Sequence, residues 1–528
     1  MNQKNLSLIS LFKKPQQFVD KLGMYRVVTL SLLVLVVWSL VAGSIGWLAY
    51  GPLPQLVSLV IALVIGFGVN SLCAKIWKIT TNHESALITI LILFFLVIPS
   101  ASFVDNIQLM TATVLAMVSK YVITYRKQHI INPVVAGTVL LVIFIGIYNL
   151  VTGSNVNVDI FTWWVASPIF ILPVLITGIL IVCKIRKWTP VLWFIGVGLS
   201  VFLLESIRFE EPLLESAAVY FESYPTLFLA FFMLTEPFTM PPTKKTQAIY
   251  GGLVGAISST ALFASFFAIT PELALLIGNL FAYFFRIRQK LQLELISKKE
   301  IARNVWEFTF KKPSSFNFKA GQYLEWMLPH SKPDNRGLRR YFTIASSPTE
   351  PAIRLAFTVE LSNGSSYKKA ILNLKSGEKI TASQLAGDFL LPKNIKKSKN
   401  IKLGFIAGGI GVTPFSSHLH YMADNNIAAD TTLYYCCKKV DEIAYKNKLT
   451  SLDIPLQFIP VVSGDCSDDG CETGRINLEM LKRRTPDFKE RLWYLSGPPN
   501  MVDAYTLLLR KAGVFRSNIK QDFFPGLA

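Results

Sequence analysis

Charged residues are scarce in this 528-residue chain: Asp, Glu, Lys and Arg make up 16% of it, against roughly 25% in ordinary soluble proteins. Acidic residues are the scarcer kind, because 34 Asp and Glu face 53 Lys and Arg, which leaves a net charge of +19. Hydrophobic residues reach 52%. This composition excludes a disordered chain, which would combine low hydrophobicity with high net charge, and it argues against a single soluble domain.

Histidine and cysteine are also few, and their positions limit the redox groups that the chain can hold. Only His83 and His129 of the five histidines precede residue 289, and they do not provide the facing pairs of axial ligands that a transmembrane haem stack needs. The six cysteines lack the four-cysteine spacing of an iron–sulfur cluster. Cys466 and Cys471 share a short loop, where a labile bridge is one alternative and free thiols are the expectation for a cytoplasmic domain. A flavin or a quinone remains as the electron carrier, and no metal site is expected.

Long apolar runs fill the chain up to Arg288, where 18 basic and 11 acidic residues leave +7. A helix needs about 20 residues to cross about 30 Å of hydrocarbon. We predict a cytoplasmic segment at 1–26 and a membrane domain of about ten transmembrane helices at 27–288. The predicted spans, of which the fourth, seventh and eighth are short, are 27–49, 55–74, 86–104, 107–123, 131–151, 161–183, 189–205, 224–238, 248–269 and 271–286.

Basic residues gather in alternate loops between these spans. Lys184, Arg186 and Lys187 follow the sixth span, for example, whereas the large loop after the seventh holds five Glu and only Arg208. This positive-inside pattern places both termini in the cytoplasm and predicts a multi-pass protein of a bacterial inner membrane, surrounded by lipid. Because topology explains the basic surplus, no nucleic-acid partner is expected.

The pattern changes from Leu291 onward. Stretches such as VWEFTF and IRLAFTVE alternate like strands, which predicts an antiparallel β-barrel domain over 289–398. After it, strand-like and helical runs alternate, which predicts an α/β domain with a parallel sheet over 399–528. The two domains together hold 35 basic and 23 acidic residues.

Four motifs follow one another in this second half. RRYFTIASSP offers an Arg for a pyrophosphate, an aromatic ring for a flavin and a Thr hydroxyl for the ring edge. Gly364-Ser365-Ser366 starts a helix and suits a phosphate. AGGIGVTP lies between a strand and a helix, where a nucleotide pyrophosphate docks, and LSGPPNMV ends another strand.

In this order the four motifs resemble the ferredoxin–NADP reductase family of flavoenzymes over nearly all of residues 290–528. The resemblance implies an FAD-dependent NAD(P)H oxidoreductase with Thr343 and Ser496 as catalytic residues. Cofactor contacts are implied for Arg340, Phe342, Thr343 and Ser366 at FAD, for Gly408, Gly409, Gly411 and Thr413 at NAD(P)H, for Gly497 and Pro498 beside the nicotinamide, and for Phe524 over the flavin.

The chain departs from that family at three places. Phe342 replaces the usual Tyr, Ser496 replaces the usual Cys, and the C-terminal aromatic residue is not the last, which leaves Phe523 or Phe524 to cover the flavin. Lys438 and Lys439 follow the second parallel strand. They suit the 2′-phosphate of NADPH, although a solvated strand end is the simpler explanation.

Polar and proline-containing stretches also interrupt the apolar half. They are SALIT, which opens the third span, KQHIINPVVAG with His129 and Asn132, which opens the fifth, and LTEPFTMPPTKKTQAIYGGLVG with Glu236, which joins the eighth and ninth. Interrupted helices often line binding sites, and a carboxylate in lipid is costly, so these three residues are candidate cofactor contacts. A helix-capping turn with Glu236 among the lipid headgroups is an equally good explanation.

The same stretches resemble the family of membrane proteins shared by the sodium-translocating NADH:quinone reductase (its B subunit) and the Rnf complex (its D subunit) over residues 20–288. This resemblance implies a second flavin, FMN or riboflavin, in the membrane domain. The chain does not match the family's Ser-Gly-Ala-Thr-Thr-like site for covalent FMN, so the resemblance does not carry covalent attachment over to this chain and leaves a noncovalent flavin open.

The hypothesis that joins both halves is a transmembrane electron path from cytoplasmic NAD(P)H, through FAD and the membrane flavin, to a quinone or an extracytoplasmic flavoprotein. Two alternatives stay open. One is a membrane-anchored flavoreductase that serves a cytosolic partner. The other is a redox-driven ion transporter, for which Glu236 is the main candidate inside the membrane.

Overall fold

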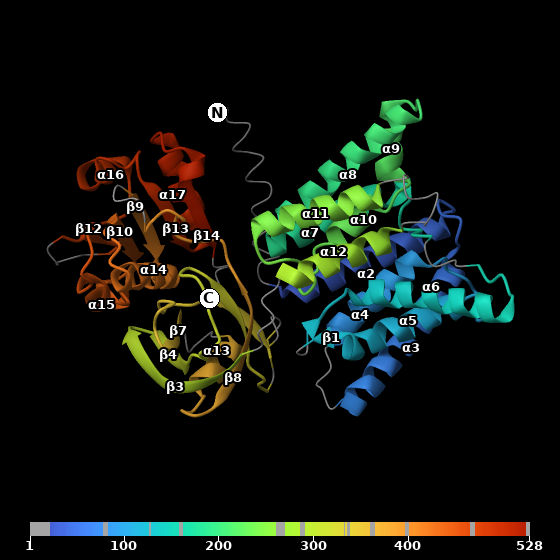
Figure 1. Cartoon of the computed structure of the whole chain (residues 1–528), viewed down its shortest axis with the longest axis horizontal. Coiled ribbons are helices and arrows are strands. Elements are labelled where there is room, and N and C mark those ends of the chain that lie inside the picture. The colour runs from blue at the N-terminus through green and yellow to red at the C-terminus, as the bar shows by residue number, and fades with distance from the viewer. Residues whose placement is uncertain are drawn as a thin grey trace. The chain divides into compact units, whose positions relative to one another are not determined.

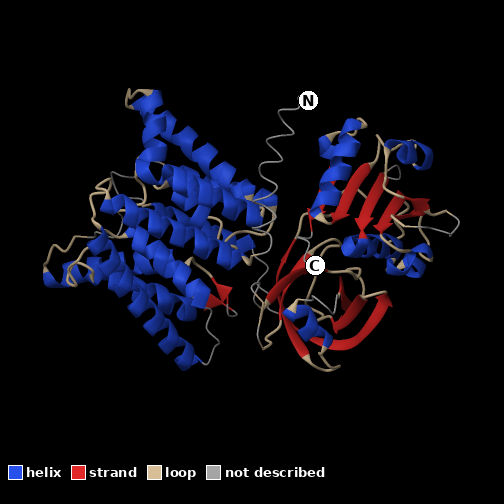
Figure 2. Ribbon diagram, turned by 180° about the vertical axis from the view of Figure 1, so that it is seen from behind, coloured by secondary structure: helices blue, strands red, loops and turns tan. Residues whose placement is uncertain are grey.

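A computed structural model divides the chain into two compact units, Met1–Arg286 and Ile287–Ala528, which we name the helical unit and the sheet unit (Figure 1). Apart from one short hairpin, the helical unit consists of helices, whereas two sheets organise the sheet unit (Figure 2). The structure describes residues 22–77, 83–125, 128–157, 162–259, 270–285, 291–331, 333–334, 338–359, 365–396, 401–464 and 470–523.

Within the described residues of the helical unit, five helices are long and apolar enough to cross a membrane. They are α2 (Met24–Ser44), α3 (Pro52–Trp77), α6 (Pro133–Thr152), α7 (Pro168–Ile185) and α8 (Trp188–Arg208). Shorter apolar helices are α4 (His83–Leu96), α5 (Ile107–Val122) and α12 (Pro271–Phe285). The prediction of about ten transmembrane helices is therefore not confirmed.

The remaining predicted spans differ most from the observed helices. The eighth, 224–238, holds only α10 (Thr226–Phe228) and the π-helix η1 (Leu229–Met233), and the ninth is represented by α11 (Lys244–Ser258). An unpredicted helix, α9 (Leu213–Glu222), precedes them. Two antiparallel strands of two residues each, β1 (Thr124–Tyr125) and β2 (Gln128–His129), precede α6. α4 ends eight residues before its predicted limit, since Pro99 follows and proline disfavours helix at and before its own position.

Small residues bring α8 and α11 into close contact. A Cβ atom on Gly251 would lie 2.2 Å from the carbonyl oxygen of Pro190, and one on Gly255 would lie 2.4 Å from that of Phe194. Such close backbone approach is the usual way in which membrane helices pack. Large apolar side chains meanwhile remain exposed on the long helices, as at Val64 of α3.

The first sheet of the sheet unit is antiparallel, with the order β6-β5-β8-β3-β4-β7. Its strands are β3 (Leu291–Ala302), β4 (Val305–Lys311), β5 (Tyr323–Met327), β6 (Arg339–Thr343), β7 (Ala352–Thr358) and β8 (Lys379–Ala386), with α13 (Ser366–Leu372) before the last. β3 pairs with β8 through its first residues and with β4 through its later ones. Among the described residues β6 and β7 remain edge strands, so the predicted closed barrel is not confirmed.

The second sheet is parallel, as predicted, with the order β12-β11-β10-β9-β13-β14. Its strands are β9 (Lys402–Gly408), β10 (Asp430–Cys437), β11 (Leu456–Val462), β12 (Glu472–Thr473), β13 (Leu492–Gly497) and β14 (Ile519–Phe523). Helices α14 (Thr413–Asp424) and α15 (Lys446–Thr450) lie on one face, and α16 (Leu478–Arg484) and α17 (Pro499–Lys511) on the other (Figure 1). Separate hydrophobic clusters fill the two faces.

Candidate active site

Two of the predicted nucleotide-binding segments lie side by side where the strand order of the parallel sheet reverses. β9 and β13 are neighbouring parallel strands, and Ala407 pairs with Ser496 near their carboxyl ends. The chain then turns through η2 (Gly409–Val412) after β9 and through Pro498 after β13. Ligands of open α/β sheets bind beyond the strand ends at such a switch point.

Glycines allow these two segments to touch. A Cβ atom on Gly411 would lie 2.4 Å from the carbonyl oxygen of Ser496, and one on Gly408 would lie 2.6 Å from Sδ of Met501. Gly409 has a φ of +52°, in the left-handed region that favours glycine. The spacing of AGGIGVTP therefore serves both a tight turn and a close approach between two strand ends.

An orphaned hydroxyl and a helix start accompany this contact. Ser496 is fully buried, and its Oγ has no hydrogen-bond partner among the described residues, which is uncommon for a buried hydroxyl. Thr413 begins the twelve-residue helix α14 directly after the glycine turn, and the positive end of a helix dipole favours an anion such as a phosphate. These features fit a bound nicotinamide nucleotide.

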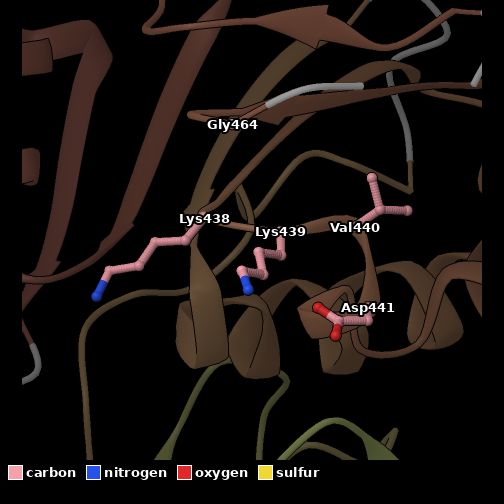
Figure 3. Close-up of a pocket in the computed structure, with 5 residues that line it drawn as sticks. All are labelled: Lys438, Lys439, Val440, Asp441 and Gly464. Carbon is pink, nitrogen blue, oxygen red and sulfur yellow. The ribbon is translucent and has the colours of Figure 1, made fainter. Parts of the chain in front are cut away.

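A cavity of about 450 Å³ opens beyond the ends of β10 and β11 (Figure 3). Its lining residues are Lys438, Lys439, Val440, Asp441 and Gly464. Asp441 forms an ion pair with Arg303 at 3.0 Å. Neither lysine ammonium group forms an ion pair with the residues described here. The two cationic groups suit an anionic ligand such as a nucleotide phosphate.

Phe342 lies at the end of a row of stacked aromatic rings. Its ring centre lies 5.1 Å from that of Phe357, and Phe357 lies 5.1 Å from Phe308. Phe308 and Phe357 are buried, while Phe342 is half-buried. Thr343, the next residue of β6, is also buried. A ring supported in this way fits the predicted contact with a flavin.

The side chain of Arg340, a residue of β6, lies beside the N-terminus of α13, which begins at Ser366. Its Nη2 donates to Oδ1 of Asp334 at 2.7 Å and to Oγ of Ser365 at 3.3 Å. Oγ of Ser366 accepts from the backbone N–H of Asp334 at 2.8 Å and bonds Nε2 of His330 at 2.9 Å. The sequence motifs did not indicate Asp334 or His330. Asp334 is an acidic competitor for Arg340 when a pyrophosphate binds.

His418 on α14 joins the two sheets. Its Nε2 donates to the carbonyl oxygens of Phe389 at 2.9 Å and Ala320 at 3.2 Å, while the fully buried Nδ1 has no partner among the described residues. Burial lowers the pKa of His418 to about 4, against the opposite influence of the two carbonyl oxygens. A neutral His418 therefore holds the helix that follows the glycine turn against two loops, one before β5 and one after β8.

In the helical unit, Asn132 starts a chain of buried hydrogen bonds. Its Oδ1 accepts from the backbone N–H of Val134 and caps α6. The backbone N–H of Asn132 donates to Oδ1 of Asn279 at 2.7 Å. Asn279 then donates to the hydroxyl of Tyr250 at 3.3 Å, which donates to the carbonyl oxygen of Leu234 at 3.4 Å. Two of the three predicted polar stretches thus meet, because Tyr250 belongs to the stretch that joins the eighth and ninth spans. Asn279, which links Tyr250 to Asn132, was not singled out by the sequence.

His129 and Glu236 belong to the same region. The rings of His129 and Phe238 lie 6.2 Å apart, so the fifth-span stretch also contacts the loop that contains Glu236. Oε2 of Glu236 accepts from the hydroxyl of Thr239 at 3.1 Å, and the side chain is only half-buried. Glu236 is therefore not the deeply buried carboxylate of this unit.

Two expectations concern residues near the ends of loops. Phe524 lies outside the described residues, although its neighbour Phe523 ends β14 and pairs in register with Gly497. Cys471 is disulfide-bonded, so the expectation of a free thiol is wrong for this residue. Cys466 lies outside the described residues.

Comparison with known families agrees with this division of the chain. Residues 405–506 match the oxidoreductase NAD-binding domain, and residues 147–290 match the NQR2, RnfD, RnfE family. The first match covers the glycine turn, the cavity lysines and Ser496. The second covers Glu236, whereas His129 and Asn132 precede it.

Several known proteins similar to this chain are reductases. The stachydrine N-demethylase reductase of Rhizobium meliloti is 28% identical over 45% of this chain and 68% of its own length. The propane 2-monooxygenase reductase component of Rhodococcus jostii is 27% identical over 41% and 58%. One component of the Na(+)-translocating NADH-quinone reductase of Psychrobacter cryohalolentis is 24% identical over 45% and 68%. This chain thus spans between 58% and 68% of these relatives.

Among solved structures, a ferredoxin NADP+ reductase from Neisseria gonorrhoeae with bound FAD and NADP is similar to 44% of this chain and 98% of its own, with a TM-score of 0.38 and 17% identity. The family matches and the related reductases identify the sheet unit as that of a flavin-dependent NAD(P)H oxidoreductase, and the chain as an enzyme. In this chain the sheet unit is fused to an NQR2- and RnfD-like membrane domain.

Proposed function

We propose that this chain moves electrons across a membrane from NAD(P)H in the cytoplasm to a quinone or an extracytoplasmic flavoprotein. The observation that carries the proposal is the fusion of two electron-transfer families in one chain, an NAD-binding reductase and an NQR2- and RnfD-like membrane domain. Both termini and the sheet unit are cytoplasmic in this proposal, because basic residues mark that side.

The residues of the sheet unit divide the work at FAD and at the nicotinamide nucleotide. FAD, when bound, accepts a hydride and releases its electrons onward. Phe342 would support the flavin ring, Arg340 and Ser366 would hold the pyrophosphate, and the buried Thr343 would serve the ring edge. Phe524 would be the aromatic residue that covers the flavin.

The switch point of the parallel sheet would hold the nucleotide. Gly408, Gly409 and Gly411 would let its pyrophosphate approach the start of α14 at Thr413, where the positive end of the helix dipole favours an anion. Ser496 offers its unpartnered hydroxyl beside the nicotinamide, where Gly497 and Pro498 shape the wall.

A second flavin, FMN or riboflavin, in the helical unit completes the path, because electrons need an intermediate carrier to cross about 30 Å of hydrocarbon. His129, Asn132 and Glu236 are its proposed contacts. The hydrogen-bond chain through Asn132, Asn279 and Tyr250 supports this placement, since it fixes two helix interruptions next to one another.

Flavin stoichiometry tests the electron path. We expect more than one flavin per purified chain, no haem absorption, and reduction of both flavins when NADH or NADPH is added. A haem Soret band, or only one flavin per chain, would contradict the proposal.

The same assay defines the electron donor. Replacing both cavity lysines, K438A with K439A, should raise the KM for NADPH about fivefold more than the KM for NADH, since only NADPH carries the additional phosphate. Equal changes for both nucleotides would show that the lysines form a solvated strand end.

A further inference from the structure

A carboxyl group that the proposed function does not use is fully buried in the helical unit. Glu272 lies in the first turn of α12 and is 0% exposed. Its Oε1 accepts a hydrogen bond from the indole N–H of Trp163 at 2.7 Å, and the side chain of Thr270 is a further polar neighbour. Its Oε2 has no hydrogen-bond partner among the described residues. An ionised carboxylate with so few donors is costly to bury.

Trp163 is held in an unusual backbone conformation beside this group. Its φ is +42°, which is rare for a bulky residue. The strained segment caps the end of α4, because the N–H of Trp163 donates to the carbonyl oxygen of Leu96 at 3.0 Å and the hydroxyl of Thr162 donates to the same oxygen at 2.9 Å. The indole of Trp164 donates to the carbonyl oxygen of Phe94 at 2.7 Å. Strain of this kind persists where the surrounding structure fixes it, often at functional sites.

Two helix ends therefore meet inside the helical unit. α4 has 14 residues, so its length is about 21 Å and is shorter than a bilayer core of about 30 Å. Leu96 at its carboxyl end is fully buried, and Trp163 links this end to the amino end of α12 through Glu272. Paired helix ends within a membrane protein are typical of sites that bind an ion or a substrate.

The chemistry of the site selects a proton over a metal ion. The carbonyl oxygens of Phe94 and Leu96 already accept hydrogen bonds, which leaves Oε2 of Glu272 as the vacant oxygen of this group. Hard divalent cations take about six oxygen ligands, and the described residues contain no cluster of acidic, His or Cys side chains that could hold a metal. Aromatic rings fill the surroundings, with Phe228 lying 6.2 Å from Trp163.

We propose that Glu272 is a proton-binding site of the helical unit. The carboxyl group carries the proton, and the indole N–H of Trp163 holds its other oxygen in place. The site differs from Glu236, the acidic residue that the sequence favoured, and it stands independently of the proposed electron path because it is a property of the resting protein.

Infrared difference spectroscopy of the full chain in H2O and D2O tests the proton at neutral pH, where exposed carboxyl groups are ionised. We expect a carbonyl-stretch band of a protonated carboxylic acid that shifts in D2O and disappears in E272Q. The matched control is E215Q, which changes an exposed glutamate of α9 and should retain the band. A wild-type spectrum without the band, or a band that survives in E272Q, would overturn the proposal.

A second variant keeps the test decisive if E272Q folds poorly. W163F removes the indole donor but leaves the carboxyl group, so the same band should persist and move to higher wavenumber as the hydrogen bond is lost. An unshifted band in W163F would overturn the assignment to Glu272.

Discussion

The two units handle buried polar groups in different ways. In the sheet unit a buried charge pairs with an opposite charge, as where Arg491 donates to Asp430 and to Asp487, each at 2.8 Å. In the helical unit the buried hydrogen bonds described here run largely to backbone groups at helix ends, as where Asn132 caps α6 or Trp164 reaches the end of α4. Water near the strand ends lowers the cost of charge, whereas hydrocarbon favours neutral hydrogen bonds.

This difference also determines where each unit can place a site. The sheet unit places its predicted residues in loops beyond strand ends, and glycines such as Gly411 allow those loops to touch. The helical unit brings its candidate residues together at helix ends, around Asn132 and around Glu272. The predictions below test each side of this comparison.

The largest expected effect is a loss of stability of the sheet unit in acid. Because the pKa of His418 is about 4 in the folded chain and about 6.5 when unfolded, the unfolded chain binds the proton first as the pH falls. The free energy of unfolding should therefore decrease by about 3 kcal/mol between pH 6.5 and pH 4. Denaturant unfolding followed by flavin fluorescence measures it. H418Q should remove the dependence and H83Q should keep it; an equal acid loss in H418Q would contradict this prediction.

Forcing the two strand ends apart should nearly abolish activity. G411A places a Cβ atom 2.4 Å from the carbonyl oxygen of Ser496, so one segment must move, and a misplacement of this size costs about 100-fold in kcat/KM for NAD(P)H. G409A has open space and only backbone strain, so about a fivefold loss is expected. Similar losses in both variants would show that conformational freedom, rather than the close approach, is decisive.

Arg340 tests whether the sheet unit recognises charge through a fixed geometry. R340K keeps the positive charge but loses the paired donors, so FAD should bind about 30-fold more weakly, equivalent to about 2 kcal/mol. Equilibrium titration of the flavin-depleted protein measures the affinity. D334N removes the partner of Arg340 instead and should not weaken FAD binding; an equal loss there would mean that Arg340 acts only through Asp334.

The smallest expected effect concerns the neutral network of the helical unit. Y250F removes the hydroxyl that joins Asn279 to Leu234, and it should cost about 0.6 kcal/mol of stability, as is usual for hydrogen bonds between membrane helices. Thermal unfolding in detergent measures the change. Y148F alters an exposed tyrosine and should have no effect. A loss of several kcal/mol in Y250F would show that the two units do not differ in this respect.

Sequence patterns predicted the architecture of the sheet unit more closely than that of the helical unit. The helix expected after AGGIGVTP is α14, and the strand–helix alternation predicted the parallel sheet, because these patterns repeat over short distances. Hydropathy, in contrast, could not separate a span from a broken helix. The stretch 224–238 is largely apolar up to Glu236, yet it holds a short α-helix and a π-helix.

Composition, charge alternation and ordered motifs determined from the sequence alone that an apolar helical half is joined to a nucleotide-binding half. The tertiary structure decided which polar residues are buried and which of them meet. Asn279 and Asn132 lie far apart in the chain, as do Trp163 and Glu272. Asp334 lies close to Arg340 in the chain but belongs to no motif. The physical reason is that burial and hydrogen-bond partnership depend on packing between distant segments, which local periodicity does not encode.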